Sequence, residues 1–210
     1  MKGFVSDVYS QNDLRILTPD DGGNYFFGYY DMPATDSKGR HLAHRTAFAD
    51  RLPDISDIAE IGYLEDGRFY KIAETTAWNF QQGAMLRYHP TAADTVCYNA
   101  VKDGNYVTVT HNYVTGEKRF TDRAVASVSP DGAKGLAVNF GRIFAFRPGY
   151  GYAGCADRYA EEAAPRRDGV FLTDMKSGSS ELLLSYADML EESSKRAERQ
   201  PRLENRTAGP

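Results

Sequence analysis

The stretch Ser127-Val128-Ser129-Pro130-Asp131-Gly132 decides the fold of this chain. It stands between two short apolar runs, at residues 123–126 and 136–140. Proline presets φ for a tight turn, aspartate can hydrogen-bond the backbone that follows it, and glycine tolerates a positive φ. The stretch therefore predicts a β-hairpin, with a strand on each side of the turn.

The same order of signals occurs twice more upstream, around Pro33 and Pro90. Each proline turn is followed by an apolar strand pattern, a loop, a second strand, a glycine turn and a third. Repeats of about 40–50 residues with four strands each are typical of β-propeller blades. A β-sandwich made of hairpins is the alternative, but the repeated proline turn favours the propeller.

We therefore predict an all-β, β-propeller-like fold of about three four-stranded antiparallel blades, at residues 27–74, 83–121 and 125–185. These blades make a partial propeller over residues 1–185, and residues 186–210 form a short C-terminal helix and a disordered tail. Propellers typically have four to eight blades, so we expect an incomplete ring that belongs to a fragment or truncated product. Such an arc exposes strand edges and an apolar blade face, which favours self-association through an open blade edge.

Composition excludes several classes of function. A net charge of −4 argues against nucleic-acid binding, which needs a basic surface. No apolar run approaches the roughly 20 residues that span a bilayer, and no signal peptide is visible. Cys97 and Cys155 have no metal or redox spacing, which predicts free thiols in a reducing compartment, the cytoplasm. The sequence predicts no cofactor and no metal site.

Three groups of residues carry a resemblance to a known family. They are Ser129-Pro130-Asp131-Gly132, Tyr29-Tyr30-Asp31 with Pro33, and Trp78-Asn79 followed by Gln81-Gln82-Gly83-Ala84-Met85-Leu86. In these motifs the chain resembles the TolB-like and oligogalacturonate-lyase-like β-propellers, over about residues 25–185. The resemblance implies a carbohydrate-associated protein that binds or processes an acidic oligosaccharide or another anionic small molecule. If the protein is an enzyme, it implies a polysaccharide-lyase-like activity.

The resemblance does not extend to a catalytic centre. Lyases of this group use metal-binding histidines in the late blades, and the four histidines of this chain do not form such a cluster. No catalytic residue is therefore carried over.

Loops that join the second and third strands of a blade, and loops between blades, gather on one face of a propeller. Alignment of the second strands on Leu42, Val96 and Leu136 gives three equivalent polar positions three residues further on. We expect these side chains to face a common channel mouth: Arg45, Asn99 and Asn139. The alternative is that the asparagines bond neighbouring backbone and tie the blades together.

A long insertion at residues 141–168 adds further candidates on the same face. Arginine forks match carboxylates, and tyrosine rings stack on sugars. We expect ligand contacts from Arg142, Arg147, Tyr150 and Tyr152, with an aromatic plug over the blades as the alternative. The connector between the first two blades should bring Gln81 and Gln82 to the same mouth.

Arg142 receives the most specific expectation. Gly141 favours a bend at the end of a strand, which would swing Arg142 into a cleft beside Asn99 and Arg45 or against Asp31. Convergence of these side chains on one cleft would favour saccharide binding. Scattered positions would favour the two other hypotheses, a protein-interaction scaffold and an inactive propeller fragment.

Overall fold

The computed structural model of the chain describes residues 15–29 and 32–199. Within these ranges the chain forms three four-stranded antiparallel sheets, which follow one another along the sequence. The first blade holds β1 (Asn24–Phe26), β2 (His41–Thr46), β3 (Ala59–Glu65) and β4 (Arg68–Thr75). The second blade holds β5 (Arg87–Tyr88), β6 (Thr95–Lys102), β7 (Asn105–Asn112) and β8 (Lys118–Phe120). The third blade holds β9 (Val125–Val128), β10 (Lys134–Ala137), β11 (Gly169–Asp174) and β12 (Ser180–Ser185).

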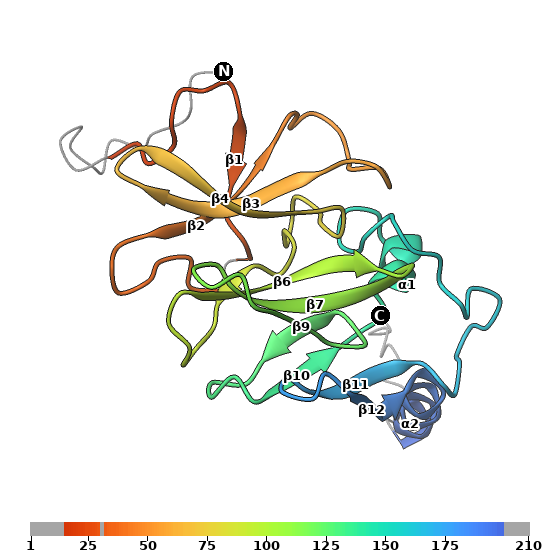
Figure 1. The fold of residues 1–210 in the computed structure, drawn as a ribbon. Coiled ribbons are helices and arrows are strands. Elements are labelled where there is room, and N and C mark those ends of the chain that lie inside the picture. The colour runs from red at the N-terminus through yellow and green to blue at the C-terminus, as the bar shows by residue number, and fades with distance from the viewer. Residues whose placement is uncertain (1–14, 30–31, 200–210) are drawn as a thin grey trace, which may run out of the picture.

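Every strand pairs only with its neighbours in sequence, so each blade is a meander from its first strand to its fourth. Figure 1 shows the three sheets stacked one on the next. The prediction of an all-β, blade-like fold with three four-stranded antiparallel sheets is confirmed. A single two-sheet sandwich is excluded because the strands divide into three sheets rather than two.

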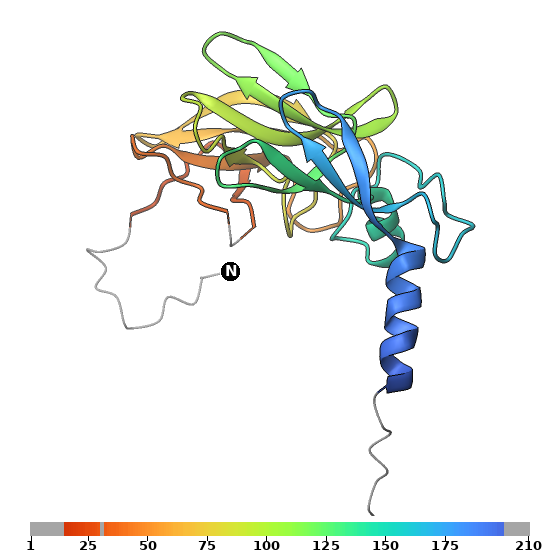
Figure 2. The ribbon, with the colours of Figure 1, turned by 90° about the horizontal axis from the view of Figure 1, so that it is seen from below.

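In the described ranges, two helices accompany the sheets. The first, α1 (Phe140–Phe146), lies in the insertion between β10 and β11. The second, α2 (Tyr186–Arg199), continues directly from β12 and projects away from the blades, as Figure 2 shows. Over the ranges that the structure describes, neither helix is long and apolar enough to cross a membrane.

Helix α1 corrects one sequence-based expectation. Asn139 was expected inside the second strand of the third blade, but β10 ends at Ala137. The Asn139 Oδ1 accepts a hydrogen bond from the Arg142 backbone N–H at 3.0 Å and so caps the helix. Asparagine competes with strand pairing by bonding nearby backbone, which makes it a favoured N-cap.

The first two blades share a packed apolar core. Leu42 and Ile61 of the first blade meet Val96 and Val109 of the second, and all four are at most 2% exposed. Trp78, from the connector between the blades, closes this core and donates its indole N–H to the Asp57 carbonyl at 2.9 Å. Trp78 is therefore a core residue rather than a ligand contact.

Buried side chains also tie each blade to the start of the next. In β6, Asn99 is fully buried and donates to the Val125 carbonyl at 3.2 Å. Its register partner Thr108 accepts from the Val125 N–H at 2.8 Å. In β2, the fully buried His44 accepts at Nε2 from the Ala84 N–H at 3.0 Å, just before the second blade begins.

The hydrogen bonds of Asn99 and His44 correct the sequence-based alignment of the second strands. His44, not Arg45, occupies the position equivalent to Asn99, because both bond the backbone that opens the following blade. Side chains alternate between the two faces of a strand, so a shift of one residue moves a side chain to the other face. Arg45 accordingly lies on the outer face of the first blade, with ion pairs to Glu60 at 2.8 Å and Asp21 at 3.3 Å.

The buried His44 predicts a pH dependence of stability. Burial lowers the pKa of His44 from 6.5 to about 4, so the unfolded chain binds the proton more tightly than the folded chain. The stability that the neutral ring provides is therefore complete above pH 6.5 and is lost as the pH falls toward 4, by roughly 3 kcal/mol in total. Chemical denaturation between pH 7.5 and 4.5 measures this slope.

His44→Gln removes this titrating group and should make the slope shallower, while His89 and His111, whose pKa values burial also lowers, keep part of it. His41→Gln changes a half-exposed histidine of the same strand and serves as the control that should keep the wild-type slope. An unchanged slope in His44→Gln would show that other groups cause the acid sensitivity.

Candidate functional site

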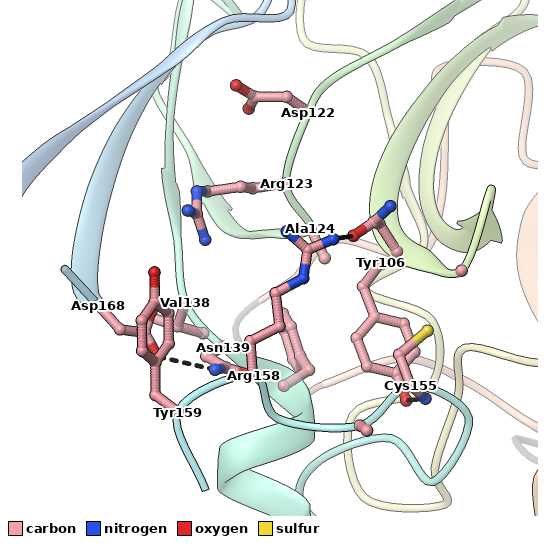
Figure 3. A pocket seen from close by; sticks show the side chains of 14 residues that line it. Tyr106, Asp122, Arg123, Ala124, Val138, Asn139, Cys155, Arg158, Tyr159 and Asp168 are labelled. Carbon is pink, nitrogen blue, oxygen red and sulfur yellow. Dashed lines mark hydrogen bonds between the residues drawn. The ribbon is translucent and has the colours of Figure 1, made fainter. Parts of the chain in front are cut away.

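A cavity of about 190 Å³ lies between the second and third blades. Three segments build it: the β6–β7 turn, the connection from β8 to β9, and the insertion between β10 and β11. These are loops between second and third strands and between blades, so the cavity opens on the face that the sequence analysis singled out. Figure 3 shows the side chains that line it.

Two arginines reach into the cavity from different segments (Figure 3). Arg123, from the β8–β9 connection, places its guanidinium 3.5 Å over the ring of Phe171. Arg158, from the insertion, donates to the amide oxygen of Asn105. Among the described residues, no carboxylate forms an ion pair with either guanidinium. Their remaining N–H groups are therefore open to an anionic ligand.

The lining of the cavity includes a carboxylate, Asp168, with an unusual environment. Asp168 is fully buried, and its Oδ2 accepts from the Asn139 amide at 2.7 Å. Its Oδ1 is also buried, yet no donor among residues 15–29 and 32–199 reaches it. Buried polar atoms almost always have a partner, so such an exception requires an explanation.

A buried ion pair holds the insertion in place beside the cavity. Arg142 is 4% exposed, and its Nη1 lies 2.9 Å from Asp157 Oδ2. The same guanidinium donates to the carbonyls of Tyr159, Glu162 and Ala163 at 2.7–3.0 Å. Arg142 thus folds the segment that carries Arg158 and Tyr159 against the third blade.

The second blade supplies another anchor. The Tyr106 hydroxyl donates to the Tyr152 carbonyl at 2.7 Å and accepts from the Cys155 N–H at 2.6 Å. Burial raises the pKa of Tyr106 above its usual value, so the hydroxyl keeps its proton. Tyr152 stacks on Phe140 with 4.3 Å between ring centroids and accepts from Asn99 at 3.1 Å.

The expected convergence of four polar side chains on one cleft is wrong. Of Arg45, Asn99, Asn139 and Arg142, only Asn139 lines the cavity. Asn99 ties the second blade to the third, which agrees with the alternative prediction that the asparagines bond the backbone of a neighbouring blade. Arg142 is buried in α1 rather than exposed beside Asn99 and Arg45, because the chain turns into a helix after Asn139. Its expected partner Asp31 lies outside the described residues.

The other candidates also lie away from the cavity lining. Tyr152 is fully buried in the core, which matches the aromatic-plug alternative. Arg147 is exposed at the end of α1, with its guanidinium 3.9 Å over the ring of Tyr150. Gln81 is exposed and Gln82 half-buried in the turn between the first two blades.

Sequence reasoning missed the side chains that do meet at the cavity: Arg123, Arg158, Tyr159 and Asp168. One signal was present, since Arg123 stands in a connector between blades, where functional loops are expected. The insertion also contains Arg158 and ends at Asp168. Nothing in the spacing shows that these residues meet, because the insertion has no strand periodicity to fix directions.

A larger cavity of about 610 Å³ lies at the opposite ends of the strands. The three proline turns of the repeat, at Pro33, Pro90 and Pro130, all contribute to it. Its buried charge is already neutralised, because Arg40 lies within 3.0 Å of both Asp36 and Asp94. The smaller cavity is therefore the better candidate for a polar ligand.

Comparison of the chain with family models, curated proteins and solved structures finds no match. Function is therefore argued from the site itself, because a fold alone does not specify an activity.

Arg142→Met tests the anchoring role of this arginine. The substitution removes the cation that pairs with Asp157 Oδ2 and the donor to three carbonyls, so it should destabilise the protein by about 3–5 kcal/mol, as expected when a buried ion pair loses one partner. Arg147→Met, at an exposed position in the same segment, should change stability by at most about 0.5 kcal/mol. Chemical denaturation measures both, and equal stabilities of the two variants would contradict the anchoring role.

Proposed function

We propose that this protein binds an acidic saccharide in the cavity between its second and third blades. The observation that carries the proposal is the pair of guanidinium groups, Arg123 and Arg158, which face one cavity without carboxylate partners in the described part of the chain. Guanidinium groups bind carboxylates through paired, charge-assisted hydrogen bonds. The motif resemblance to propellers of carbohydrate metabolism supports the same ligand class.

The size and lining of the cavity narrow the ligand. Its volume of about 190 Å³ is below the 300–1,000 Å³ of sites for drug-sized ligands, so one acidic sugar unit is held while the rest of an oligosaccharide extends outside. Tyr159 and Asn139 add polar groups and an aromatic ring to the wall. These groups suit a ligand that combines a carboxylate with hydroxyls.

The proposed function is binding of the saccharide. If the protein also acts on the bound saccharide, the motif resemblance implies a polysaccharide-lyase-like reaction. Cys97 and Cys155 are free thiols, which supports a cytoplasmic location, where thiols stay reduced.

Calorimetry with a galacturonate trisaccharide and with a neutral glucose trisaccharide tests the proposal. The acidic ligand should bind, and Arg123→Ala should weaken its binding by about 1.5–3 kcal/mol, the range for a hydrogen bond to a charged group. Arg119→Ala removes an exposed arginine on β8 that pairs with Glu117 and should leave the affinity unchanged. Equal affinities for the acidic and neutral trisaccharides would contradict the proposal.

A protein-interaction scaffold is the second candidate, favoured by the outer face of the third blade. Leu136 pairs with Leu172 across the strands, Val170 pairs with Leu184, and Leu136 and Leu184 are 40% and 43% exposed. The outer face of the first blade instead carries ion pairs, such as Lys71 with Glu60. The apolar face therefore fits a second copy of itself better than it fits the first blade of another chain.

Sedimentation over a range of concentrations tests this second candidate. The wild-type chain should self-associate, and Leu136→Lys should return it to the monomer because a charge then meets apolar surface. Lys71→Leu on the other outer face is the control and should not disrupt the association. A wild-type chain that stays monomeric at every concentration would exclude the scaffold of identical copies.

A further inference from the structure

One oxygen of the Asp168 carboxylate has no hydrogen-bond donor among the described residues, and this oxygen indicates which kind of anion the cavity binds. Asp168 lines the cavity and has no exposed surface. One carboxylate oxygen is fixed by Asn139 at 2.7 Å, while the other, Oδ1, receives no hydrogen bond from the described residues. The side chain is thus held in position by one oxygen and left with an open acceptor on the other.

The surrounding side chains do not neutralise this acceptor. Arg142, the buried cation of the same region, is engaged with Asp157 and with three backbone carbonyls. Asn139 divides its amide between Asp168 and Asp157, at 2.7 and 2.9 Å. Both Arg142 and Asn139 are therefore already committed to other acceptors, and Oδ1 keeps an acceptor site that a ligand can use.

We propose that Asp168 Oδ1 accepts a hydrogen bond from a hydroxyl group of the ligand. This inference rests on the proposed function and makes it more specific, because it names a hydroxylated carboxylate, such as a single uronate unit, as the ligand class. The carboxylate of that unit lies against Arg123 and Arg158, and one of its hydroxyls points to Asp168.

The same carboxylate selects against other anions. Sulfate places negative charge on every outer oxygen and has no hydrogen to donate at neutral pH. Asp168 repels it and gains no hydrogen bond in return. A site built to bond a hydroxyl discriminates strongly against an analogue that lacks one, since its buried polar group then stays unpaired.

Access to Oδ1 requires a small movement, because the atom is buried from solvent. Arg158 is exposed and Tyr159 half-buried, and both belong to the irregular segment that lines the cavity. Movement of the Tyr159 side chain admits a ligand hydroxyl to the Asp168 carboxylate, while Arg158 stays against the carboxylate of the ligand.

An unpaired buried carboxylate also destabilises the free protein, which gives a measurement that needs no ligand. In Asp168→Asn the group keeps an oxygen for Asn139 and places an amide NH2 where Oδ1 stood, so only the buried charge is removed, and Tm should rise by roughly 2–8 °C. Asp122→Asn is the matched control. Asp122 lines the same cavity, but it accepts from the backbone N–H and hydroxyl of Ser180, so its neutralisation should lower Tm.

The ligand experiment uses galacturonate and cyclohexanecarboxylate, which share a carboxylate on a six-membered ring but differ in hydroxyls. Calorimetry on the full chain should show galacturonate binding at least tenfold more tightly, and Asp168→Asn should remove most of this preference. Arg123→Ala should weaken both probes alike.

The outcomes distinguish failure of the Asp168 role from failure of the proposed saccharide site. Galacturonate that binds wild type and Asp168→Asn equally, together with a lowered Tm in the variant, overturns the role of Asp168 and leaves the saccharide site standing. Galacturonate that does not bind wild type overturns the proposed function and the role of Asp168 with it.

Discussion

The hydrogen bonds that join each blade to the beginning of the next are the interactions on which the structure depends. Asn99 and Thr108 hold both polar backbone groups of Val125, and His44 accepts from Ala84. All of these side chains are buried. The connecting loops alone do not orient one four-stranded blade against the next. These hydrogen bonds and the apolar core between blades therefore determine how the sheets stack. The loops meet at a cavity only because the sheets stack in this way.

Polar side chains that make their hydrogen bonds within the protein hold the scaffold together, whereas polar side chains that lack partners mark the candidate site. Arg142, Asn99 and Arg40 look like candidates for binding, yet each has its hydrogen bonds or ion pairs filled by the protein. Their role is to hold segments together. In the described part of the chain, Asp168 instead keeps a buried oxygen without a donor, and Arg123 and Arg158 have no carboxylate partner. A buried polar group without a partner destabilises the fold, so Asp168 at the cavity is more informative about function than a charged residue on a surface loop.

The misplacement of Arg45 has a specific physical cause. A strand has a period of two, so an alignment that is wrong by one residue inverts the face of every side chain that follows. Leu42 and Val96 both look like core positions, and both are buried in the same core. However, Leu42 points from the first blade toward the second, whereas Val96 points from the second blade toward the first. The two positions are therefore not equivalent in their blades. The hydrophobic pattern identifies buried positions without saying which neighbour buries them.

The sequence by itself determined the number of blades, their four-stranded antiparallel order and the helical C-terminal segment. These features depend on local rules: turn residues with a required φ, alternating side chains and repeats of constant order. It also pointed to the face where interblade loops and the insertion gather. Only the tertiary structure decided which polar side chains meet there. The insertion folds through contacts such as Arg142 with Asp157 and with distant carbonyls, and contacts between residues far apart in the chain leave no periodic pattern in the sequence.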